Sequence, residues 1–264
     1  MIQRRSTIAW LGALPLLTTS NNFAQVVNLS DAVNKAGRQR MLVQRSGKAY
    51  FAIGMGVAVP RAQDILSQSM TQFDRQLIEL KAFSPTPEIK ATYGEMEAVW
   101  SEYKTALIGQ APKRESAQTL IDIDGKLLAL ANKGASALEQ LVGKPVGKLV
   151  NVAGRQRGLS QRVAKLYLAM AWKAPVNGAQ AELNTARADF SAALDLLSKA
   201  PETTAQIKEE LDQARNQWVF YDSALTLKDG ESAAPERVAN VFASSENILS
   251  VMEKVTSLYV RAGA

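Results

Sequence analysis

A cationic motif with no acidic residue stands out in the chain. It reads Ala-Gly-Arg-Gln-Arg, then three intervening residues and Gln-Arg, and its first copy contains Gly37, Arg38, Arg40, Gln44 and Arg45. The planar guanidinium group offers paired N–H donors that match the oxygens of carboxylates and other oxyanions. Because the motif carries no acid of its own, its charge must be neutralised by carboxylates elsewhere or by a bound anion.

The motif recurs as part of a longer internal repeat. Its second copy contains Gly154, Arg155, Arg157, Gln161 and Arg162. Residues 34–52 and 151–169 are identical at 12 of 19 positions at a constant offset of 117. Weaker similarity continues downstream, where Trp100 and Tyr103 align with Trp218 and Tyr221, side chains that we expect in the core. The chain is therefore a tandem duplication of a unit of about 115 residues.

The elements that must hold these motifs are helices. Apolar residues recur at steps of three and four, and the alternation of a β-strand is almost absent. Proline- and glycine-rich breaks lie near residues 60, 84–87, 109–112, 175–178, 201 and 229–235. They leave helices of roughly 20 to 30 residues, and short connections favour antiparallel neighbours. We expect an all-α fold of two tandem up-down four-helix bundles related by internal duplication, covering residues 25–143 and 144–264.

Helical spacing places the motif residues on defined faces. Residues three, four and seven apart share a face, so Gly37, Arg40, Gln44 and Lys48 form one stripe. Glycine inside a helix costs about 1 kcal/mol relative to alanine, which indicates that another helix or a ligand approaches Gly37 closely.

Two interpretations of the arginines remain open from composition and periodicity. They could form ion pairs with carboxylates of other helices, for which Asp122, Asp124 and Glu97 are candidates. Alternatively, they could bind a small oxyanion.

The first 24 residues are typical of a secretory signal peptide. Arg4 and Arg5 precede the apolar stretch of residues 8–17, and a cut after Ala24 is plausible. Ten apolar residues are too few to span a bilayer, although an N-terminal anchor or a buried helix is the alternative. We expect a periplasmic protein with no stable membrane insertion after cleavage.

Composition excludes several classes of chemistry. The chain has no cysteine and no histidine, so it can hold no disulfide, thiol nucleophile, Cys/His zinc site or Ser-His-Asp triad. The acids lack metal-ligand spacing, and we expect no enzyme, no catalytic residue, no metal and no cofactor. A net charge of +6 is too small for a typical nucleic-acid binder, so we expect no nucleic-acid partner.

The string of residues 34–45 resembles the P-box of bacterial nitrate/nitrite sensor kinases. It is at least as similar to the first helix of the PilJ-type N-terminal domain of type IV pili methyl-accepting chemotaxis transducers. The resemblance covers both repeats and implies that each unit is a periplasmic four-helix bundle. In the sensor kinases, the P-box glycine and the arginine three residues later bind nitrate at a dimer interface.

The resemblance implies site residues in both units. The nitrate-binding positions match Gly37, Arg40, Gly154 and Arg157, with Arg38, Gln44, Arg45, Arg155, Gln161 and Arg162 in supporting positions. The second copy departs from the pattern, because Gly158 replaces the methionine found at position 41.

Our hypothesis is that the two first helices pack as a pseudo-dimer and hold one anion between Arg40 and Arg157. The competing geometry places each motif inside its own separate bundle. The expected function is periplasmic binding of nitrate or nitrite. We expect no signalling segment in this chain, so occupancy would be reported to a membrane sensor, transporter or chemotaxis transducer. The alternative is a helical interaction scaffold in a pilus or chemotaxis assembly, whose basic face docks an acidic protein.

Overall fold

The computed structural model describes residues 25–143, 145–225 and 233–263, and these contain helices and no strand. The helices are α1 (Leu29–Met55), α2 (Val59–Phe83), α3 (Pro87–Ile108), the short 3-10 helix η1 (Arg114–Ser116), α4 (Ala117–Val142), α5 (Pro145–Ala171), α6 (Ala179–Lys199), α7 (Ala205–Ala224) and α8 (Pro235–Gly263). The expected all-α fold of two duplicated four-helix units, α1–α4 and α5–α8, is confirmed.

Local signals in the sequence set the ends of these helices. The side chain of Asn28 caps α1 by accepting a hydrogen bond from the Asp31 amide at 2.9 Å, and Thr204 caps α7 in the same way. Gly56, at φ 74°, and Gly143, at φ 64°, end α1 and α4 in the left-handed conformation that glycine adopts without strain.

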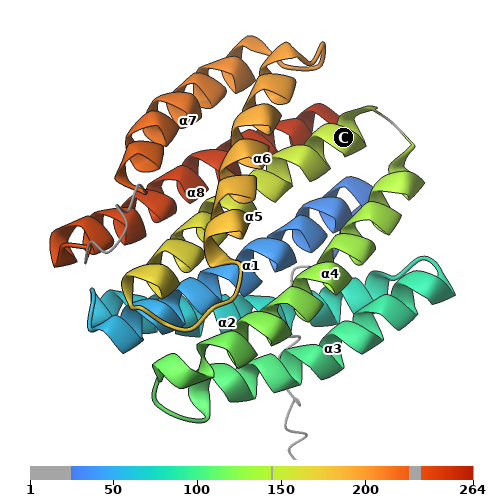
Figure 1. The fold of residues 1–264 in the computed structure, drawn as a ribbon. Coiled ribbons are helices and arrows are strands. Elements are labelled where there is room, and N and C mark those ends of the chain that lie inside the picture. The colour runs from blue at the N-terminus through green and yellow to red at the C-terminus, as the bar shows by residue number, and fades with distance from the viewer. Residues whose placement is uncertain (1–24, 144, 226–232, 264) are drawn as a thin grey trace, which may run out of the picture.

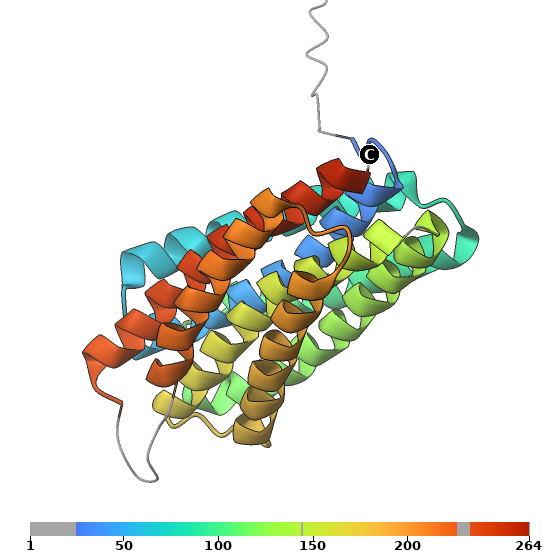
Figure 2. The ribbon, with the colours of Figure 1, turned by 90° about the horizontal axis from the view of Figure 1, so that it is seen from above.

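The two units pack against each other mainly through their first helices, α1 and α5. α1 and α5 lie side by side in the middle of the molecule, and α4 and α8 flank them (Figure 1). The pair α2 and α3 lies on one side of this inner group, and α6 and α7 lie on the other (Figures 1 and 2). The buried apolar residues of both units form one continuous core. The competing geometry, with each motif inside a separate bundle, therefore does not occur.

The expected core role of the aromatic residues is confirmed. Trp100 stacks on Phe73 with the ring centroids 4.0 Å apart, and Trp218 stacks on Phe190 at 4.1 Å. Both tryptophans are buried. The duplicated units therefore keep the same aromatic packing.

The expected signal peptide, residues 1–24, lies outside the described residues. Within the part of the chain that the structure describes, every helix is too short or too polar to cross a membrane.

Candidate functional site

Helices α1 and α5 come closest where the two motif glycines face each other. A Cβ atom on Gly37 would lie 3.6 Å from the Cα of Gly154, and one on Gly154 would lie 3.8 Å from the Cα of Gly37. The Cβ on Gly37 would also lie 3.1 Å from Nη2 of Arg157 and 3.2 Å from Nη2 of Arg40. The glycines therefore let two backbones and two guanidinium groups share one small space.

Arg40 and Arg157 each reach across the crossing to an asparagine of the other repeat. Nη2 of Arg40 donates to Oδ1 of Asn151 at 2.6 Å and to its carbonyl oxygen at 3.2 Å. Nη1 of Arg157 donates to Oδ1 of Asn34 at 2.9 Å, and Nη2 donates to the carbonyl oxygen of Asn34 at 3.0 Å. The first helices thus pack as the expected pseudo-dimer, while an anion held between Arg40 and Arg157 stays a prediction.

The two arginines differ in how their charge is balanced. The side chain of Arg157 is 0% exposed, and its Nη1 donates to Oε2 of Glu253 on α8 at 2.9 Å. Burial lowers the pKa of Arg157, and Glu253 opposes this effect. Arg157 is therefore a buried cation with a carboxylate partner.

Arg40 has no such partner. Burial, followed by repulsion from Arg157 and Arg155, lowers the pKa of Arg40 to about 9, so the side chain is still cationic at neutral pH. Its buried Nε has no hydrogen-bond partner, and in the described residues no carboxylate forms a direct ion pair with it. Glu139 on α4 acts on it through Asn151, whose amide donates to Glu139 and accepts from Arg40, and this carboxylate partly opposes the fall in pKa. The Oδ1 of Asn132 on α4 lies at 3.4 Å from Nη1. A buried guanidinium in this state is a candidate anion receptor.

The supporting arginines all pair with carboxylates of other helices. The pairs are Arg38–Glu253 at 2.6 Å, Arg45–Glu246 at 2.5 Å, Arg155–Asp189 at 2.8 Å and Arg162–Glu182 at 2.7 Å. The ion-pair interpretation is thus right for these four, but the carboxylates it named are wrong. Asp124 accepts from Gln44 and Lys165, Glu97 pairs with Lys81, and Asp122 accepts from Gln118.

A second buried polar layer lies about two turns further along α1 and α5, and its lysine–carboxylate pairs were not predicted from the sequence. Lys48 donates to Glu246 at 2.6 Å, and Lys165 donates to Asp124 at 2.6 Å. Gln161 donates to the carbonyl oxygen of Ser245 at 2.8 Å. Lys48 and Lys165 are identical in the repeat, as are Asn34 and Asn151, so the repeat carried a signal for these residues.

A small cavity between α4 and α5 opens beside Arg40. It has a volume of about 40 Å³, and the cationic side chains of Arg40, Arg155 and Arg162 line it together with Gln44, Asn132 and Gly158. No acidic residue is in this lining. The cavity therefore adjoins the one motif arginine that has no carboxylate partner.

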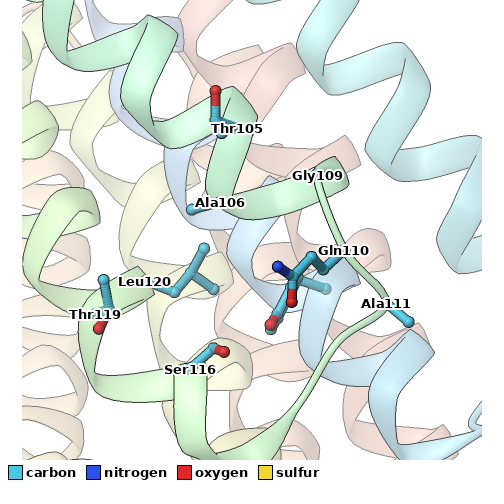
Figure 3. Close-up of a pocket in the computed structure, with 9 residues that line it drawn as sticks. Thr105, Ala106, Gly109, Gln110, Ala111, Ser116, Thr119 and Leu120 are labelled. Atoms are coloured by element: carbon cyan, nitrogen blue, oxygen red, sulfur yellow. The ribbon is translucent and has the colours of Figure 1, made fainter.

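A larger cavity lies at the connection between α3 and α4 (Figure 3). It has a volume of about 310 Å³, and its polar lining includes Thr105, Gln110, Ser116 and Thr119. This lining contains no charged side chain and no motif residue, so it offers no counter-charge for an anion. The described residues also contain no cluster of three or more acids that could hold a metal ion.

The fold and the crossing define a tandem helical-bundle protein whose two units share a polar, arginine-lined interface. A sequence model of the PilJ family, described as "Type IV pili methyl-accepting chemotaxis transducer N-term", matches residues 21–123 and 142–242. The chain belongs to this family and carries its domain twice. Each match includes the first helix of one unit, with its motif, so both motifs lie in domains of the chemotaxis-transducer type. No curated protein and no solved structure matches the chain significantly.

Proposed function

We propose that the protein is a sensory binding protein for a small oxyanion, with nitrate or nitrite as the first candidates. One observation carries this proposal: two arginines from a repeated motif are buried at a glycine crossing, and Arg40 has an unpartnered Nε and no direct ion pair with a carboxylate of the described residues. A buried cation of this kind is costly unless an anion or hydrogen-bond acceptors compensate it. Because the P-box of nitrate/nitrite sensor kinases has glycine and arginine at these positions, its resemblance to the motif supports the same ligand class.

The proposal includes a periplasmic location and a membrane partner. The location rests on the composition of residues 1–24, and the partner rests on membership in a family named for chemotaxis transducers. Occupancy at the α1–α5 crossing would be reported to a membrane sensor, transporter or chemotaxis transducer. Cell fractionation tests the location: the protein should be recovered with the periplasmic fraction, and N-terminal sequencing should find the first 24 residues removed.

The alternative, an interaction scaffold that docks an acidic partner through its basic motif, has less support. Arg40 and Arg157 are buried, and the other four motif arginines already pair with carboxylates of neighbouring helices. The motif thus presents little free positive charge to a protein partner. A scaffold would have to use other surfaces, such as α7, where Phe220 is 77% exposed and Val219 is 61% exposed.

Thermal unfolding of the purified protein tests the ligand class. Sodium nitrate, nitrite and sulfate would be compared with sodium chloride at matched ionic strength. A ligand at 100 times its dissociation constant stabilises the folded state by about 2.7 kcal/mol, which raises the melting temperature by several degrees at this chain length. We expect a selective rise with nitrate or nitrite that is lost in Arg40→Ala. An equal effect of every salt would reject oxyanion sensing and favour the scaffold.

A further inference from the structure

The fourth helices of the two units differ at one equivalent position beside the arginines. Nη1 of Arg40 faces Oδ1 of Asn132 on α4, and Nη1 of Arg157 faces Oε2 of Glu253 on α8. Because Arg40 and Arg157 are equivalent residues of the repeat, Asn132 and Glu253 occupy equivalent positions beside them. The duplicated chain therefore carries a neutral amide on one side of the crossing and a carboxylate on the other.

The Glu253 carboxylate shows what the arginines on its side can hold. It accepts from Nε of Arg38 at 3.1 Å, from Nη2 of Arg38 at 2.6 Å and from Nη1 of Arg157 at 2.9 Å. Burial opposes its ionisation, but Arg157 and Arg38 outweigh burial and lower the pKa of Glu253 to about 2. In this half of the molecule, the Glu253 carboxylate is therefore the planar, singly charged oxyanion that Arg38 and Arg157 bind.

The other half offers the same cations without the carboxylate. Arg40 and Arg155 are the repeat equivalents of Arg157 and Arg38, and both line the 40 Å³ cavity between α4 and α5. Arg162 also lines the cavity, and the Nε of Arg40 is buried without a partner. The pairs of Arg155 with Asp189 and of Arg162 with Glu182 lie on the α6 side. The cavity itself has only cationic, amide and apolar lining.

A second difference between the repeats keeps this cavity open. Met41 is buried, whereas its repeat equivalent Gly158 lines the cavity beside Arg40. The nearest atom to a Cβ on Gly158 would be the backbone carbon of Arg40 at 3.6 Å, an ordinary contact. A methionine side chain at position 158 would extend into the space that the glycine leaves.

We propose that this cavity binds one planar, singly charged oxyanion in the role that the Glu253 carboxylate has on the opposite side. The proposal rests on the oxyanion-binding function above and narrows it to a single site on the Arg40 side of the crossing. A water needs roughly 10–15 Å³ on the same scale, so the cavity has room for an ion of three or four non-hydrogen atoms. Nitrate, nitrite and formate fit this description better than the tetrahedral, doubly charged sulfate.

Isothermal titration of the full protein with sodium nitrate, sodium nitrite, sodium formate and sodium sulfate tests the site. We expect one site per chain, with nitrate or formate bound at least tenfold more tightly than sulfate. Asn132 is an exposed residue of α4, and Asn132→Glu would place a carboxylate beside Arg40, so nitrate affinity should fall at least tenfold. Gln140→Glu adds the same charge to α4, at a position outside the cavity lining, and should change the affinity less than twofold.

Gly158→Met provides an independent test that changes shape without changing charge. It should also lower nitrate affinity at least tenfold, with helicity and cooperative melting checked by circular dichroism. Nitrate binding that survives in both Asn132→Glu and a folded Gly158→Met would overturn this site while leaving the oxyanion function intact. If the wild-type protein binds neither nitrate nor nitrite nor formate, the proposed function fails and the site fails with it.

Discussion

Lys165 of the second unit donates to Asp124 of the first at 2.6 Å, and the two side chains are 3% and 4% exposed. The reciprocal contact runs from Lys48 of the first unit to Glu246 of the second, also at 2.6 Å. Each unit thus places a lysine from its first helix on a carboxylate of the other unit's fourth helix. These pairs, together with the continuous core, join the duplicated bundles into one body.

Breaking the Lys165–Asp124 pair should destabilise the protein strongly. Lys165→Met leaves the Asp124 carboxylate buried with only neutral donors, and removal of one partner from a buried pair costs about 3–5 kcal/mol. The free energy of unfolding from urea titration measures this loss. Arg215→Met breaks the half-exposed pair with Asp195 and should cost less than about 1 kcal/mol. Equal losses in the two variants would contradict the role assigned to the buried pair.

We expect the protein, with both of its units, to unfold in one cooperative transition. The shared core and the reciprocal ion pairs leave neither unit with a complete interior of its own. Differential scanning calorimetry should give a single peak whose calorimetric and van't Hoff enthalpies agree. Phe190→Ala, in the second unit, should shift the entire peak to lower temperature, because removal of a buried phenylalanine costs about 3–5 kcal/mol. Two resolved peaks would contradict a shared core.

A larger residue at the helix crossing should separate α1 from α5. In Gly37→Val, even the Cβ atom would meet guanidinium nitrogens of Arg157 and Arg40 at 3.1 and 3.2 Å, and the two methyl groups find no room. We expect a loss of about 1–3 kcal/mol in the free energy of unfolding. Gly94→Val is the matched control, since its Cβ meets nothing within 4 Å and valine is a better helix former than glycine. It should be neutral or slightly stabilising.

Acid should destabilise the protein through two partly buried carboxylates, Glu246 and Glu253. Burial opposes ionisation of Glu246, but Lys48 and Arg45 outweigh it and lower its pKa to about 2 from 4.5; the pKa of Glu253 is also lowered to about 2. Because both values are depressed in the folded state, their stabilisation is complete above about pH 4.5 and is lost as the pH falls toward 2. The free energy of unfolding, measured by urea titration at several pH values, should fall by a few kcal/mol over this range.

The Glu253→Gln variant isolates one of these contributions. It should be less stable than the wild type at neutral pH, because Arg157 and Arg38 lose their charged partner, and its decline below pH 4.5 should be shallower. Glu95→Gln, on an exposed face of α3, should follow the wild-type curve. If the free energy of unfolding of Glu253→Gln falls below pH 4.5 as steeply as that of the wild type, the arginines do not lower the pKa of Glu253 in the folded protein.

The sequence alone determined the helices, the duplication and the residues at the crossing. Periodicity and the proline and glycine breaks predicted eight long helices, because local hydrogen bonding and capping depend on residues that are close in the chain. The glycine of the first motif predicted a close approach at Gly37, because a glycine inside a helix lowers helix stability and needs a compensating contact. The repeat made Arg40 and Arg157 equivalent before any contact was known.

Only the tertiary structure decided which charges meet. Glu246 and Glu253 lie about 200 residues from Arg45 and Arg38 in the chain, and nothing local in α8 marks them as partners. The fourth helices have diverged in sequence, so the equivalence of Asn132 and Glu253 becomes visible only when both are seen beside their arginines. Burial and electrostatic pairing depend on distances between helices. Those distances, and not the spacing of residues along one helix, leave Arg40 without the carboxylate that Arg157 has.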